Sequence, residues 1–260
     1  MIERLSKYTF PVIEKELYTD ENPFNISTGL KAIYREDETD FSKYLGYHTE
    51  DYVLIPNKEV LDAGIEIIED AGLKIERISD KWSNESDKNM NVMLVTDKGF
   101  DIDGDETKLS LSIVNSYDGS RSYGFDFGCY RMVCSNGLYV GERILAVRRK
   151  HVNQFQPDVL REQIMIAMEK FPQLERQIRN LKETTLSQEK IDKLFENALK
   201  RKLMTKEEGK NLSSIINGQP NQDMYWMFNL LTYYITHILN TSFQRKIKLS
   251  QYISKQMLGM

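Results

Sequence analysis

The sequence predicts an α+β protein, in which a mainly antiparallel sheet with one or two helices precedes a helical region packed on it. Before residue 150, short apolar segments with period-two alternation are separated by hairpin turn signals. After residue 150, capping and breaking residues delimit long helical segments. With 260 residues, of which 40% are hydrophobic, the chain is long enough to bury a sizeable core.

The first predicted elements follow one another closely. Residues 51–56 are typical of a short strand. Asn57 is placed to cap a helix over about 58–71, and Gly72 is placed to end it. A second strand is expected near residues 73–78.

The rest of the β-rich part is expected to be strands joined by hairpins, after a polar loop over 79–90. Leu109, Leu111 and Ile113 alternate with other side chains, which predicts a strand. A turn is expected around 97–99, and hairpin signals stand at 118–120 and 136–137. The strands expected between these turns cover residues 91–95, 109–114, 121–134 and 138–148.

Helical signals dominate the remainder of the chain. Pro157 suits the first turn of a helix, Ser187 is a candidate cap, and Thr205–Glu208 has the pattern of a capping box. Residues 217–221 interrupt the helical pattern. The expected helices cover about 157–181, 188–202, a third from Thr205, 223–240 and 243–258.

Charge is distributed unevenly along the chain, although the formal net charge is only −4. Residues 1–142 hold 15 Lys+Arg and 28 Asp+Glu, whereas residues 143–260 hold 20 and 11. We therefore expect an acidic β-rich domain over 1–150 and a basic helical region over 151–260. Such asymmetry indicates nucleic acid, a membrane surface or self-association as partner, and simple solvation of each half is the alternative.

The compartment is suggested by cysteine content and by the N-terminus. Two cysteines cannot form a disulfide scaffold, and the count favours a reducing compartment. Residues 1–7 lack the apolar stretch of a signal peptide. The apolar run 224–239 is too short and too interrupted by polar residues for a membrane span. A protein of the host-cell cytoplasm without a membrane partner is expected.

Two motifs carry a resemblance to a known family. The first runs from Asn115-Ser116-Tyr117-Asp118-Gly119-Ser120 to the stretch 130–138, together with 148–151. The second, on the helix over 223–240, consists of Trp226, Asn229, Thr232, Tyr234 and His237.

Over roughly residues 90–250 the chain resembles the phage/plasmid-like family catalogued as domain of unknown function 932. The helix motif has one residue fewer between Trp226 and Asn229 than the family pattern, and the usual Asn-Ala pair appears as Asn229-Leu230. The resemblance implies a phage, prophage or plasmid context. It implies no reaction.

The strand 121–127 invites a nucleic-acid interpretation. Tyr123, Phe125 and Phe127 alternate, and aromatic rings on a sheet face can stack bases. The pattern partly matches the aromatic strand of RNA-recognition sheets, although Ser122 and Asp126 depart from it. The alternative is that the three rings line the core side of the sheet.

Clustered cations supply candidate phosphate contacts. One cluster lies at the junction of the two halves, and a second lies at the end of the helix expected over 188–202. Salt bridges to the acidic half, within one chain or between subunits, are the equally weighted alternative. The candidate nucleic-acid-binding residues are Arg121, Arg143, Arg148, Arg149, Lys150, His151, Lys200, Arg201 and Lys202.

Catalytic, metal and cofactor signals are weak. Residues 101–106 resemble the start of a calcium loop, but Glu106 occupies the glycine position and Ser112 the position of the final glutamate, so a solvated turn is expected. Cys129, Cys134 and three histidines show no zinc spacing. Cys134 next to Ser135 has no assignable base. We therefore predict no catalytic residue, no metal and no cofactor, and do not favour an enzyme.

The function expected from these observations is nucleic-acid binding without catalysis by a mobile-element protein. Single-stranded DNA in annealing or recombination is its specific form, and homo-oligomers are expected. The annealing step rests on fold-level analogy. The alternative is a protein that assembles with itself or binds a host factor, since acidic and basic halves can pair head to tail.

Overall fold

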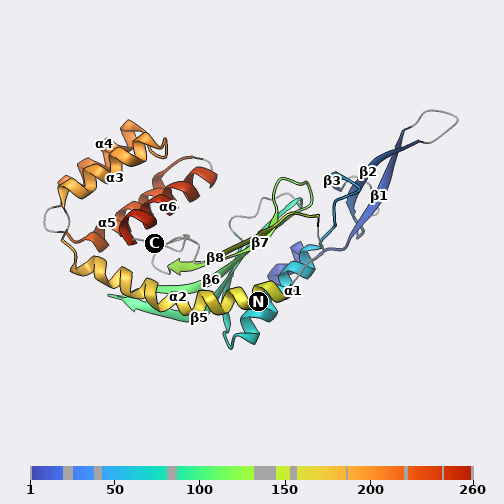
Figure 1. Ribbon diagram of the computed structural model, residues 1–260, viewed down its shortest axis with the longest axis horizontal. Coiled ribbons are helices and arrows are strands. Elements are labelled where there is room, and N and C mark those ends of the chain that lie inside the picture. Colours follow the sequence, from blue (N-terminus) through green and yellow to red (C-terminus); the bar gives the residue numbers. More distant parts are fainter. Residues whose placement is uncertain are drawn as a thin grey trace. The chain divides into compact units, whose positions relative to one another are not determined.

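The computed structural model describes residues 2–19, 26–37, 43–80, 87–131, 145–152, 157–185, 187–219, 222–241 and 243–258 (Figure 1). The chain forms two compact units. The first comprises residues 1–97, 110–127 and 146–165, and the second comprises residues 98–109, 128–145 and 166–260. Both units therefore draw residues from both sides of position 150.

A three-stranded antiparallel sheet lies in the first unit, in a region for which the sequence analysis assigned no element. It consists of β1 (Val12–Thr19), β2 (Ile26–Arg35) and β3 (Tyr44–Thr49), in the order β1-β2-β3. A short 3-10 helix, Ile2–Tyr8, precedes it. The buried residues Phe10, Ile33, Leu45 and Tyr117 form its core.

Helix α1 (Asn57–Asp70) confirms the helix that was expected over 58–71. Its buried side chains include Val60, Leu61 and Ile67, at the spacing of one helix face. Gly72 has φ +73°, the left-handed conformation that ends many helices, so the predicted stop is confirmed. The predicted cap is wrong, because Asn57 is already helical and its side chain accepts a hydrogen bond from Asn115.

A five-stranded sheet contributes residues to both units. Its strands follow chain order, so each pairs with its sequence neighbours. They are β4 (Ile75–Ser79), β5 (Asn89–Ile102), β6 (Asp105–Ser116), β7 (Tyr123–Arg131) and β8 (Leu145–Arg149).

Two sequence predictions about these strands are wrong. Residues 52–56 form no strand; the Val53 N–H donates instead to the His151 carbonyl at 2.7 Å. No turn interrupts β5 at 97–99, since this stretch stays paired, with Gly99 close to the Thr107 carbonyl of β6. The β5–β6 turn lies at residues 103–104.

The hairpin at 118–120 is confirmed between β6 and β7. The strand expected near 73–78 is confirmed as β4. The hairpin at 136–137 and the first part of the strand expected over 138–148 lie outside the described residues.

Long helices follow the sheet. The predicted ends are close for α2 (Asp158–Glu183), α3 (Gln188–Lys200) and α6 (Phe243–Leu258). The Thr205 capping box is confirmed at the start of α4 (Lys206–Asn217). The helix expected over 223–240 is α5 (Met224–Tyr233), continued by a π-helical turn over Tyr234–Ile238.

These elements confirm the α+β fold class (Figure 1). In the second unit, α6 contacts α3 and α5, and the buried side chains of α6 include Leu249, Tyr252 and Ile253. Within the described residues, each helix is too short or too polar to serve as a membrane-crossing segment.

Candidate nucleic-acid interface

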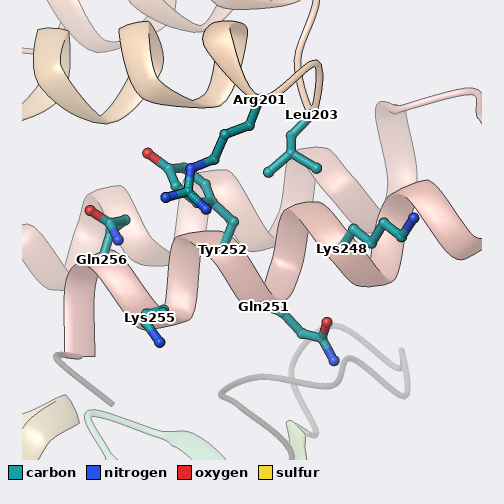
Figure 2. A pocket seen from close by; sticks show the side chains of 7 residues that line it. All are labelled: Arg201, Leu203, Lys248, Gln251, Tyr252, Lys255 and Gln256. Atoms are coloured by element: carbon teal, nitrogen blue, oxygen red, sulfur yellow. The ribbon is translucent and has the colours of Figure 1, made fainter.

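A cationic groove lies on the helical part of the second unit and has a volume of about 620 Å³. Most of its wall is one face of α6, and the segment that follows α3 supplies the rest (Figure 2). We call it the α6 groove. Its lining residues are Arg201, Leu203, Lys248, Gln251, Tyr252, Lys255 and Gln256.

The helical repeat explains why α6 presents these side chains together. Lys248, Tyr252 and Lys255 stand at positions i, i+4 and i+7, which share one face of an α-helix. At 1.5 Å per residue, the two lysines are separated along the helix axis by about 10 Å. Figure 2 shows Arg201 reaching toward the same face from the segment after α3.

Tyr252 orients the arginine and joins two helices. Its hydroxyl donates to the Leu194 carbonyl of α3 at 3.0 Å, and only 6% of the residue is exposed. Burial raises the pKa of this phenol, which therefore remains a hydrogen-bond donor. The Arg201 guanidinium carbon lies 5.6 Å from the ring centroid, within the range of a cation–π contact.

No carboxylate lines the described part of the α6 groove. Among the described residues, Arg201 and Lys248 form no ion pair. The described lining therefore carries a net positive charge, and Arg201 and Lys248 can pair with an anion from outside.

The other two cations of α6 serve the fold. Arg245 donates to both carboxylate oxygens of Glu208 at 2.6 and 3.1 Å. Partial burial acts to raise the pKa of Glu208, but hydrogen bonds from Arg245 and Thr205 outweigh it and the pKa lies below its ordinary value. Lys246 donates to the Thr236 carbonyl at 3.2 Å. Only the cations at 248 and 255 of α6 therefore line the groove.

The predicted cluster at 200–202 contributes one residue to the groove. Arg201 lines it, whereas Lys200 pairs with Glu196 on its own helix at 2.7 Å. Lys202 has φ 57° and is exposed just beyond the end of α3.

Sequence analysis missed Lys248 and Lys255. A usable signal was present: after Asp223 the sequence contains no Asp or Glu up to residue 260. The i, i+7 spacing of the two lysines would then have placed them on one face of the predicted helix over 243–258.

The predicted junction cluster is divided between different roles. Arg148 forms an ion pair with Asp126, a carboxylate that is only 2% exposed, so this arginine follows the salt-bridge alternative. Arg149 and Lys150 are exposed. Arg143 lies outside the described residues.

His151 is not a phosphate-binding cation, which corrects the prediction. Only 5% of it is exposed, and its Nδ1 lies 3.3 Å from the Val53 carbonyl. Burial lowers the pKa of this imidazole, so it is neutral near pH 7. Arg121 and Lys150 line a separate cavity of the first unit.

The base-stacking prediction for the β7 aromatics is also wrong. Tyr123, Phe125 and Phe127 are 4%, 1% and 1% exposed, respectively. They belong to the core, because a strand that is covered on a face buries its alternate side chains there. No ring face of the three is open to a base.

The turn of residues 103–104 carries no metal cluster among the described residues. The Asp101 carboxylate accepts from the Gly104 N–H at 2.9 Å, and Lys182 forms an ion pair with Asp103. Burial raises the pKa of the Cys129 thiol, which makes it a poor nucleophile. Cys134 and Ser135 lie outside the described residues.

The family-like stretch 115–120 builds the β6–β7 turn. The Ser116 hydroxyl donates to the Arg121 carbonyl at 2.8 Å and accepts from its N–H at 3.0 Å. Asp118 accepts from the Ser120 N–H at 3.0 Å, and Asn89 donates to Asp118 and accepts from Ser120. These motif residues therefore act on the fold rather than on an external ligand.

Comparison with known proteins gives a family. No curated protein and no solved structure matches the chain. A family model described as a domain of unknown function matches residues 44–255, which includes most of the described sheet and helices. The chain therefore belongs to the family of this domain of unknown function, DUF932.

Proposed function

We propose that the protein binds nucleic acid through the α6 groove, by contacts to backbone phosphates. One observation carries the proposal: Arg201, Lys248 and Lys255 line one groove together with two glutamines, and the described lining holds no carboxylate. Lysine and arginine side chains are the principal phosphate ligands of nucleic-acid-binding proteins, and glutamine adds neutral donors.

The spacing of the lysines favours a polymer over a single anion. Lys248 and Lys255 emerge about 10 Å apart along the helix, so each can bind a phosphate of its own. Phosphates recur about every 3.4 Å along each strand of a duplex, so a nucleic-acid backbone offers several phosphates over this length. An anionic polymer can therefore contact both lysines at once.

The groove supports binding without strong sequence preference, because phosphate contacts carry no base information. Within this proposal, the specific form is single-stranded DNA in annealing or recombination of a mobile element. Its support is the motif resemblance to phage and plasmid proteins together with the cationic groove. Catalysis is not part of the proposed role.

The test is fluorescence anisotropy of labelled single-stranded DNA, duplex DNA and RNA across a salt series. With three phosphate contacts, log affinity for a single strand is expected to fall against log salt with a slope of about −2. Absence of binding near ~50 mM salt, or binding with no salt slope, contradicts the proposal.

A matched pair of variants assigns the site. The double substitution Lys248→Gln and Lys255→Gln is expected to weaken binding to all sequences and to make the slope shallower by about 1.4. The control is the double substitution Lys206→Gln and Lys210→Gln, at two exposed lysines of α4 outside the groove, which removes the same two positive charges from the same unit. Equal loss in the control would show that overall charge, and not the groove, drives binding.

The alternative function, self-assembly or binding of a host factor, predicts another outcome. Light scattering would then show a large assembly whose size does not respond to DNA or RNA. Nucleic-acid binding predicts that any assembly changes when a strand is added.

A further inference from the structure

A second cavity, of about 520 Å³, lies entirely within the first unit. It differs from the α6 groove in having aromatic walls. Its lining residues include four with aromatic side chains, Tyr47, His48, Tyr52 and His151. We call it the Tyr47 cavity.

Three of these rings form a stacked column. The His48 and Tyr52 centroids are 3.6 Å apart with 6° between the planes, and those of Tyr52 and His151 are 4.6 Å apart with 13°. The Tyr52 hydroxyl donates to the Ser116 carbonyl at 3.2 Å, and His48 Nε2 lies 2.6 Å from the Tyr117 carbonyl. The wall is thus held in place before any ligand arrives, which lowers the entropic cost of binding.

Tyr47 is the most exposed of the four aromatic lining residues named above. It follows Gly46 on β3 and is 63% exposed, whereas His151 is 5% exposed. An exposed tyrosine among the lining residues of a cavity offers its ring to a planar ligand. Base–aromatic stacking of this kind is used by single-strand-binding proteins.

Two cations border the same cavity. Arg121 and Lys150 both line it, and neither forms an ion pair with another described residue. The backbone of Arg121 is fixed by its two hydrogen bonds to Ser116. Asp51 is the one carboxylate among the described lining residues and offers an acceptor to an exocyclic amino group.

His151 adds a hydrogen-bonding group with no described partner. Its Nδ1 faces a carbonyl, which can only accept, so this nitrogen carries the proton and Nε2 is left as an acceptor. Nε2 is buried and has no hydrogen-bond partner among the described residues. This nitrogen is closed to solvent, so His151 belongs to the wall of the cavity and is not itself a ligand contact.

We infer that the Tyr47 cavity receives one unpaired nucleobase, stacked on Tyr47, with an adjoining phosphate bound by Arg121 and Lys150. This inference rests on the proposed function and deepens it, because it names unpaired strands as the preferred substrate. A base in a duplex has both faces covered by its neighbours and must first be unstacked, whereas a single strand offers the base directly. The α6 groove alone does not distinguish a single strand from a duplex, because it contacts phosphates and both forms carry them.

The experiment compares a single strand with a duplex that has the same number of phosphates, using the full chain. Tyr47→Ala is expected to lower single-strand affinity at least about fivefold and to leave duplex affinity unchanged, since loss of one stacked base costs at least this much. Tyr47→Phe keeps the ring and is expected to bind as the wild type does. An abasic strand removes the bases while keeping the phosphates, so it should bind wild type and Tyr47→Ala equally.

The outcomes separate this inference from the proposed function. If Tyr47→Ala binds single strands like the wild type while the Lys248 and Lys255 substitutions still weaken binding, the base cavity is wrong and the groove stands. If neither set of substitutions matters because no strand binds, both fail. If a nucleoside monophosphate saturates the cavity while polynucleotides do not bind, the assignment to a strand is overturned. Circular dichroism of each variant checks the fold.

Discussion

The hydroxyl of Tyr117 accepts a hydrogen bond from the backbone N–H of Asn57 at 2.7 Å. The residue that follows strand β6 thereby satisfies a free donor at the start of α1, where Pro56 offers no capping side chain. Asn115 acts in parallel, because its amide donates to the Ile55 carbonyl and to the Asn57 side chain, both at 2.9 Å. The family-like motif thus sets where the helix begins.

Removal of the Tyr117 hydroxyl tests this relationship. Tyr117→Phe leaves a buried N–H without a partner and is expected to lower the free energy of unfolding by about 1–3 kcal/mol. Urea denaturation followed by circular dichroism measures it. Tyr47→Phe removes an exposed hydroxyl of the same unit and is expected to change stability by less than about 0.5 kcal/mol. Equal effects would mean that the hydrogen bond contributes little.

The Arg148–Asp126 pair predicts a stability effect in place of a binding effect. Arg148→Met removes the ion-pair partner of the buried Asp126 carboxylate and is expected to destabilise the fold by about 3–5 kcal/mol. The double variant with Asp126→Asn also removes the carboxylate charge and should recover most of that loss. Chemical denaturation of the wild type, the two single variants and the double variant completes this double-mutant cycle. A double variant as unstable as Arg148→Met would show that the charge is not the cause.

His151 predicts how stability depends on pH. Burial lowers its folded-state pKa below the ordinary value of 6.5, so below this pH the unfolded chain binds the proton more readily than the folded one. The stabilisation that comes from this lowered pKa is fully present above about pH 6.5 and is lost as the pH falls. Unfolding free energy measured between pH 7 and 5 should decrease in wild type.

A non-titrating variant isolates this contribution. His151→Asn can retain a donor to the Val53 carbonyl and cannot become an imidazolium, so its stability should change less over the same interval. Parallel curves for the two proteins would assign the pH dependence to other groups.

Gly46 predicts a steric effect at the Tyr47 cavity. A Cβ at this position would lie 2.3 Å from the Tyr117 carbonyl oxygen and 2.7 Å from the Asp118 Cα, both backbone atoms that cannot rotate away. Gly46→Ala is expected to destabilise the fold by about 1–3 kcal/mol or more. Gly218→Ala, which meets nothing closer than 3.5 Å and has helical φ, should be neutral or slightly stabilising. Thermal unfolding compares the two.

Elements with local signals were predictable. The capping box Thr205–Glu208 and the helix over 243–258 depend on side chains a few residues apart, and both are confirmed. The three-stranded sheet of residues 12–49 was missed, since its pairing joins strands through contacts that no short window contains. The strand expected at 51–56 was wrong because Val53 bonds to the distant His151.

The candidate binding sites show the same difference between local signals and long-range contacts. The chain's own residue order determined the fold class, the helix caps, the family motif and the excess of cations in its second part, because each depends on neighbouring residues. Which cations are available to a ligand was decided only by tertiary structure. Arg148 pairs with the buried Asp126 and Lys200 with Glu196, whereas Arg201 and Lys248 form no ion pair with a described residue and line one groove together. Charge is a property of residues, but availability depends on which carboxylates folding brings within a few ångströms.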